Sequence, residues 1–167
     1  KGLLPEEWAL SQCLFGEHLL SMYPDRTVAL VESEKTAVFC AGFIPEYVWL
    51  ATGGKTSLGN KLDVLSGRKV VAYPDVDAYG LWCERLSVYS NIKVSDYLQH
   101  IAGDNPSFSH MDLADLILES RLHPDTSQNP TFQQIKRYIS PEYHSETEAL
   151  IEDLCLEFLG VDYAPSD

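Results

Sequence analysis

The sequence predicts an α/β domain with a mostly parallel four-stranded sheet flanked by helices, followed by a helical extension. Short β-branched apolar runs alternate with segments whose apolar residues have helical spacing. This alternation favours βαβ units, in which neighbouring strands run parallel. After Gly103 the pattern changes to amphipathic helices. We therefore expect three parts: an N-terminal helical segment (1–26), the α/β domain (27–103) and an acidic helical extension (104–167).

Each expected strand is followed by a turn or a helix. The expected strands are 27–32, 47–51, 68–74 and 91–94. Helices are expected over 10–23, 33–43 and 78–90, and in the extension over 110–122, 130–139 and 145–160. Ser33 is expected to cap the helix that it begins, because a serine hydroxyl can accept a hydrogen bond from a free amide of the first turn. A glycine-rich turn that leads into a helix is expected over 52–67.

The negative charge is concentrated in the extension. The chain has 167 residues and a formal net charge of −13. Residues 1–103 hold 12 acidic and 9 basic residues, whereas 104–167 hold 13 and 3. This charge distribution predicts no strongly basic surface for binding nucleic acid, but it does not exclude nucleic acid as a partner of residues 1–103.

Neither a membrane nor a disulfide-rich secreted class fits the composition. No apolar run is long enough to span a bilayer. The opening residues do not have the pattern of a signal peptide. The four cysteines are scattered without zinc-binding spacing, which favours reduced thiols in a cytoplasmic protein. Because the first residue is Lys1, we expect a fragment of a longer protein.

Two aspartates at the end of an apolar segment give the strongest indication of a functional site. The segment VVAYPDVDAYG (70–80) places Asp75 and Asp77 one residue apart. Neighbouring carboxylates repel each other and raise each other's pKa, so a compensating divalent cation is the simplest explanation. Glu32 ends the first expected strand. In a parallel sheet the ends of the strands share one edge, where we expect these three carboxylates to converge.

Three motifs, in this order, resemble the toprim domain, the catalytic fold shared by bacterial-type primases, type IA and type II topoisomerases and some nucleases. They are VESEKTA at 31–37, ATGGKTSL at 51–58 and YPDVDAYG at 73–80. The first resembles the EGEKTA variant of primase-like proteins from phages and mobile elements. The last resembles the DxDxxG motif of the family. The resemblance covers about residues 27–100.

The resemblance implies a domain that uses Mg²⁺ or Mn²⁺ to transfer nucleotides, as a DNA primase does in primer synthesis, or to cleave phosphodiester bonds. By position, Glu32 takes the role of general acid or base, and Asp75 and Asp77 hold the metal. Supporting or phosphate-contacting roles fall to Glu34, Lys35, Gly53, Gly54, Lys55 and Gly80. The implied partners are a DNA template, nucleotides, and a helicase or other replication proteins, with no membrane.

The same residues also have structural interpretations. Asp75 and Asp77 can form a turn that caps the next helix. Glu34 suits the first turn of a helix, where negative charge is favourable. Lys35 is slightly better explained as a solvated helix residue than as a phosphate contact. The glycines at 53–54 can equally join a strand to a helix or present amides to a phosphate.

Two other functions stay open. A toprim fold of weak catalytic power can act as a binding module in a replication or mobilisation complex, with the acidic helices as its docking surface. A small-molecule phosphatase would use one aspartate as nucleophile, but it leaves Glu32 unexplained. Asp112 and Asp115, three residues apart, are better explained as an acidic helix N-terminus than as a second metal site.

Overall fold

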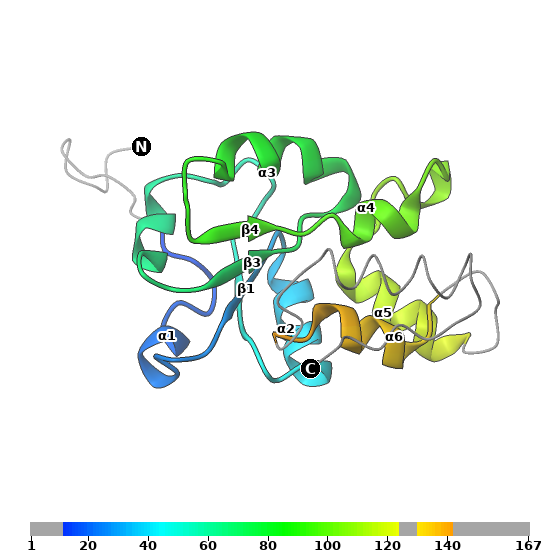
Figure 1. The fold of residues 1–167 in the computed structure, drawn as a ribbon, viewed down its shortest axis with the longest axis horizontal. Coiled ribbons are helices and arrows are strands. Elements are labelled where there is room, and N and C mark those ends of the chain that lie inside the picture. Colours follow the sequence, from blue (N-terminus) through cyan, green and yellow to red (C-terminus); the bar gives the residue numbers. More distant parts are fainter. Residues whose placement is uncertain (1–11, 124–129, 142–167) are drawn as a thin grey trace, which may run out of the picture.

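The sheet has four parallel strands, as the sequence predicts. The computed structural model describes residues 12–123 and 130–141. The strands are β1 (Val28–Val31), β2 (Val48–Ala51), β3 (Val70–Ala72) and β4 (Ile92–Val94), in the order β2-β1-β3-β4 (Figure 1). Val28 lies in register with Val48 on one side and with Val70 on the other. Because every neighbouring pair is parallel, the carboxyl ends of the strands lie along one edge of the sheet.

The apolar runs of β1 and β2 are continuous because both faces of these strands are covered. All four residues of each strand are buried. Side chains of a strand alternate between its two faces. Accordingly, Ala29 and Val31 belong to one hydrophobic core, whereas Val28 and Leu30 belong to another. The alternating apolar and polar pattern of a half-exposed strand is therefore missing from the sequence.

Helices cover both faces of the sheet. One face is covered by α2 (Glu34–Phe43), with α5 (Leu113–Leu122) and α6 (Phe132–Ile139) beside it, and the other by α3 (Tyr79–Leu86) (Figure 1). The shorter helices are α1 (Leu19–Met22), α4 (Tyr97–Ala102) and the 3-10 helices η1 (Asn60–Leu65), η2 (Val76–Ala78) and η3 (Pro106–Phe108). Within residues 12–123 and 130–141, no helix combines the length and the apolar character needed to cross a membrane.

Local capping fixes where three helices begin. Ser33 Oγ accepts a hydrogen bond from Thr36 N at the start of α2, which confirms the predicted cap. Helices α5 and α6 begin with capping boxes on Asp112 and Thr131. Each box satisfies amides that the first turn of a helix leaves without a partner. The predicted helices over 110–122 and 130–139 are thus confirmed, each beginning two or three residues later than expected.

The predicted helix over 10–23 is largely wrong. Within 12–23, the described part of this range, only α1 (Leu19–Met22) is helical. Phe15 instead forms an isolated antiparallel bridge with Ala51, with N···O distances of 3.0 and 3.2 Å. The segment therefore satisfies its backbone at the edge of β2, and tertiary pairing outweighs the helical spacing of its apolar residues.

Two further boundaries differ from the predictions, and one prediction is not described. The helix expected within 52–67 is the short 3-10 helix η1, since the glycine-rich part before it forms a turn. The helix expected over 78–90 ends at Leu86. The helix expected over 145–160 lies outside the described residues.

Replacing Gly16 with alanine should lower the free energy of unfolding by about 1–3 kcal/mol. Gly16 has a φ of +79°, and an added Cβ would lie 2.9 Å from the carbonyl oxygen of Trp49. Gly42 of α2 is a matched control, because no heavy atom lies within 4 Å of a Cβ built there. Gly42→Ala should leave stability unchanged or raise it by up to about 1 kcal/mol, since alanine is the better helix former. Urea unfolding measures both variants, and equal losses would contradict the role given to Gly16.

Candidate active site

The three predicted carboxylates lie at the carboxyl edge of the two central strands. Glu32 follows β1 directly, and the segment that carries Asp75 and Asp77 follows β3. The register places Leu30 beside Ala72, and Tyr73 N donates to Leu30 O at 2.8 Å. Parallel pairing thus brings together residues that lie more than forty positions apart in the chain.

The glycine-rich loop after β2 holds Glu32. Gly53 N donates to Glu32 O at 2.9 Å. The backbone amide of Lys55 donates to the Glu32 side chain. The Lys61 ammonium donates to Thr52 O and so anchors the start of the same loop. Two amides of the loop are therefore directed at Glu32, which gives the loop a positioning role.

The two glycines of this loop occupy backbone conformations that other residues rarely adopt. The φ angles are +78° at Gly53 and +147° at Gly54. A Cβ on Gly53 would lie 3.3 Å from Glu34 Oε1. Glu34 occupies the first turn of α2, as its structural interpretation predicts. At Gly80, by contrast, no heavy atom lies within 4 Å of a built Cβ.

Glu32 carries an unsatisfied oxygen. Its Oε2 is buried and has no hydrogen-bond partner among the described residues. Burial raises the pKa of Glu32, the amide of Lys55 opposes this shift, and the charge of Asp77 adds to it. A buried carboxylate oxygen without a partner costs free energy. It therefore marks a position where a cation, a proton or a donor on a ligand is favoured.

Asp75 is the most perturbed of the three carboxylates. Burial and the nearby charge of Glu32 raise its pKa to about 7, and Asp112 and Asp77 add smaller repulsions. At neutral pH this side chain lies midway between its charged and neutral forms. Repulsion between like charges in a partly buried position raises the pKa of a carboxyl group in this way.

Asp77 differs because the Lys55 ammonium and the His110 ring lie beside it. Lys55 Nζ lies 2.7 Å from Asp77 Oδ2, and His110 Nδ1 lies 3.4 Å from the same oxygen. The hydrogen bond from Lys55 lowers the pKa of Asp77. Lys55 therefore contacts the site through both its backbone amide and its ammonium group.

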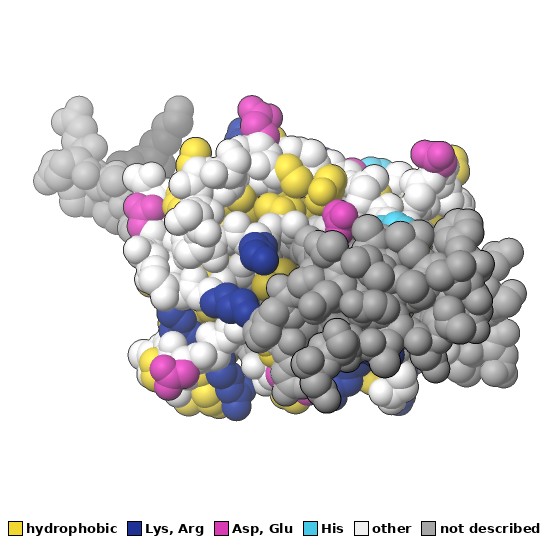
Figure 2. Space-filling view, in the orientation of Figure 1, with side chains coloured by type: hydrophobic (Ala, Val, Ile, Leu, Met, Phe, Trp, Pro, Cys, Tyr) yellow, Lys and Arg dark blue, Asp and Glu magenta, His cyan; other side chains and the backbone are white. Residues whose placement is uncertain are grey.

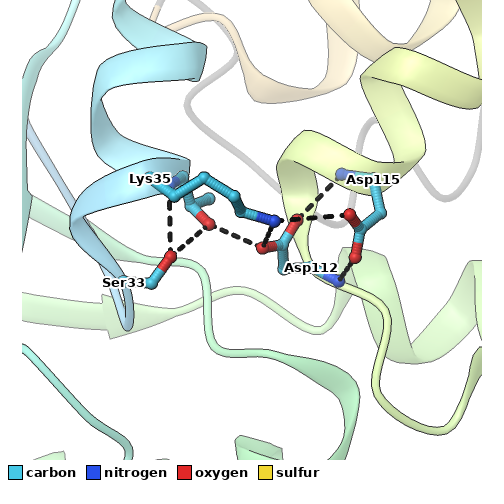
Figure 3. A network of polar contacts seen from close by, with 5 residues as sticks. Ser33, Lys35, Asp112 and Asp115 are labelled. Carbon is cyan, nitrogen blue, oxygen red and sulfur yellow. Dashed lines mark hydrogen bonds and ion pairs between the residues drawn. The ribbon is translucent and has the colours of Figure 1, made fainter.

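Asp112 is a fourth carboxylate at the site, and the sequence analysis placed it at an acidic helix N-terminus. It is the N-cap of α5, and its side chain is 8% exposed. Its Oδ2 accepts a 2.6 Å hydrogen bond from Thr36 Oγ1 and lies 2.8 Å from Lys35 Nζ (Figure 3). The negative charge of Asp112 also contributes to the raised pKa of Glu32 and Asp75.

Lys35 joins the start of α2 to the start of α5. Besides Asp112, its ammonium contacts Asp115 Oδ1 at 3.4 Å (Figure 3). Burial opposes the charged form of Lys35, but the ion pair with Asp112 outweighs it and the pKa is raised. The solvated interpretation was incomplete, because the side chain is 61% exposed yet its tip makes two ion pairs.

The side chains at this edge are of the chemical type that hard divalent cations prefer. Within residues 12–123 and 130–141, no three acidic, histidine or cysteine side chains are grouped closely enough to hold a metal in this conformation. Yet the available ligand atoms are carboxylate oxygens. One buried oxygen of Glu32 lacks a hydrogen-bond partner among these residues, and Asp75 is repelled by its neighbours. Carboxylate oxygens are the ligands that Mg²⁺ prefers.

Asp75→Asn should raise the free energy of unfolding at pH 8 by about 1–3 kcal/mol. The folded-state pKa of Asp75, about 7, is above its ordinary value, so its contribution to stability is complete at low pH and is lost as the pH rises toward 8. Asp77→Asn is the matched control and should lower stability by up to about 1 kcal/mol, since the ion pair with Lys55 disappears. Urea unfolding at pH 5 and pH 8 measures both. Stabilisation by Asp75→Asn that did not grow with pH would contradict the repulsion.

Asp112→Ala should lower the free energy of unfolding by about 2–4 kcal/mol, because it removes a helix cap and the buried acceptor that the Thr36 hydroxyl and the Lys35 ammonium share. Asp115→Ala is the control. It removes the reciprocal half of the capping box and a pair whose side chains are 61% and 51% exposed, so the loss should be about 0.5–1 kcal/mol. Thermal unfolding compares the two, and equal losses would show that burial of Asp112 is not what matters.

Comparisons with known proteins give one partial family match and no activity. A family model described as a domain of unknown function (DUF6371) matches residues 2–76. A search of curated proteins and a search of solved structures gave no match. The matched range includes Glu32, both loop glycines and Asp75. The chain is therefore similar to DUF6371 over the segment that contains β1, β2 and β3.

Proposed function

We propose that this chain is a magnesium-dependent, toprim-type catalytic domain of a primase-like protein, which transfers nucleotides or acts on phosphodiester bonds of DNA. One observation carries the proposal. The buried Oε2 of Glu32 has no hydrogen-bond partner within residues 12–123 and 130–141, and it lies at the strand edge that also holds the repelled Asp75. A cluster of this kind is costly for folding alone, and such perturbed carboxylates are frequent at functional sites.

The residues divide into two roles. Asp75 and Asp77 would hold Mg²⁺ or Mn²⁺, which when bound neutralises charge on phosphate oxygens. Glu32 would accept or donate the proton of the attacking or leaving hydroxyl. Its raised pKa supports this role, because a carboxyl group whose pKa lies closer to 7 is a better general acid and base at pH 7. The loop amides that contact Glu32 would keep it oriented.

The nearby cations favour an anionic substrate. Lys55 makes an ion pair with Asp77 and Lys35 makes one with Asp112. On the face shown in Figure 2, Lys and Arg side chains also gather in the lower left part of the molecule, toward α1. A nucleic-acid backbone would meet positive charge there. A DNA template, nucleotides, replication proteins such as a helicase, and a cytoplasmic location follow from the proposal.

The second candidate is a toprim-fold binding module without appreciable catalysis. The ion pair between Lys55 and Asp77 favours it, because an internal ammonium already compensates one of the proposed metal ligands. In that case the acidic helices of the extension would dock a basic partner. The two candidates differ in whether a divalent cation binds at the strand edge.

Calorimetric titration of Mg²⁺ and Mn²⁺ should show saturable binding that is weakened at least about tenfold in the Asp75→Asn, Asp77→Asn double variant. The titration uses the 167-residue chain, first alone and then with a short single-stranded oligonucleotide, since substrate phosphates often complete a magnesium shell. Asp25→Asn with Asp63→Asn is the matched control, because both aspartates are exposed.

The outcomes separate the candidates. Loss of binding in the site variant, with normal binding in the control, would support the catalytic domain. Equal behaviour of all three proteins with the oligonucleotide present would overturn the metal site, and the binding module would then be preferred.

A further inference from the structure

A cavity lies beside the carboxylate site, at the start of α5. It has a volume of about 250 Å³. Sites for drug-sized ligands measure about 300–1,000 Å³, so this cavity suits one ring system rather than a whole nucleotide. Its lining comprises Ser107, Phe108, His110, Met111, Asp115, Leu116 and Glu119.

Three contacts join the wall of this cavity to the proposed metal site. His110 Nδ1 lies 3.4 Å from Asp77 Oδ2, and Asp115 Oδ1 lies 3.4 Å from Lys35 Nζ. Met111 O accepts a hydrogen bond from Val76 N at 3.1 Å, within the segment that carries both metal-site aspartates. A ligand could therefore occupy the cavity and the carboxylate edge together.

The lining combines an aromatic ring and an apolar floor with a carboxylate. Met111 and Leu116 are buried, and Phe108 is partly buried against the same core. Both carboxylate oxygens of Asp115 are engaged, one by Lys35 and one by Asp112 N. The Glu119 carboxylate is more available as a hydrogen-bond acceptor than that of Asp115, because its Oε1 makes only a long contact of 3.8 Å with His123 Nε2.

We propose that this cavity binds the base of a guanine nucleotide, and that the phosphates of this nucleotide lie at the Glu32, Asp75 and Asp77 edge. Guanine is the common base that offers two adjacent N–H donors to one carboxylate, and Glu119 would accept both. Adenine and cytosine place a ring acceptor beside their amine, which a carboxylate repels. The ring would contact Phe108, as bases do on aromatic side chains. The position of the phosphates rests on the proposed function, whereas the base contact does not.

Amide chemical-shift titration of the 167-residue chain with GMP, IMP and AMP in Mg²⁺ tests the proposal. GMP should bind about 10- to 100-fold more tightly than AMP. IMP lacks the exocyclic amine and should lie between them. Shifts should be largest at Phe108, Met111 and Leu116. Equal affinities, or no shifts at these three residues, would overturn the guanine site.

Variants separate the base contact from the metal site. Glu119→Gln should remove most of the preference for GMP over AMP, and Phe108→Leu should weaken all three nucleotides. Glu84→Gln, an exposed glutamate on α3, is the matched control and should change nothing. In the Asp75→Asn, Asp77→Asn double variant, affinity should fall equally for all three nucleotides while the preference for GMP persists. If the double variant lost binding but Glu119→Gln kept the preference, the metal site would stand and the guanine site would be overturned.

Discussion

The crowding of negative charge at one edge of the sheet is the constraint on which the rest of the site depends. Parallel pairing of β1 with β3 places Glu32 and Asp75 at neighbouring strand ends, and Asp112 adds its charge from the start of α5. Among the described residues, each of these carboxylates except Asp75 has a donor: the Lys55 amide for Glu32, the Lys55 ammonium for Asp77, and Lys35 for Asp112. The compensation is therefore uneven, and Asp75 carries most of the remaining repulsion.

Because the compensation is uneven, some of these carboxylates stabilise the fold and others destabilise it. In the ion pair of Asp112 with Lys35, the carboxylate is buried. The pair holds α5 against α2 and so stabilises the packing of the two helices. Asp75 and the unsatisfied oxygen of Glu32 do the opposite, since repulsion and lost hydration both reduce stability. Residues that lower stability at a cluster of this kind are the ones for which a ligand is the natural compensation. This asymmetry favours Glu32 and Asp75 as the reactive part of the site.

Sequence patterns predicted the parts of this arrangement that depend on local chemistry or on a general rule of topology. The apolar runs located β1 to β4, Ser33 and Asp112 were identified as helix-start residues, and the rule for parallel strand ends placed Glu32 near Asp75. The bridge of Phe15 to Ala51 and the approach of Asp112 to Lys35 were not predictable in the same way. Both contacts join residues far apart in the chain whose local patterns, an amphipathic run and a capping box, are complete without a partner.

The position of Lys35 shows how the start of α5 influences the charges at the strand edge. Lys35 lies in the first turn of α2, which follows Glu32, and its charge lowers the pKa of Asp75. Asp112 and Asp115 hold its ammonium at the start of α5, at distances of 2.8 and 3.4 Å (Figure 3). The capping box of α5 thus brings one more carboxylate close to the edge, together with a cation that partly offsets it. Asp112 affects the pKa of Asp75 more than Lys35 does, so the start of α5 adds to the crowding of negative charge at Glu32 and Asp75.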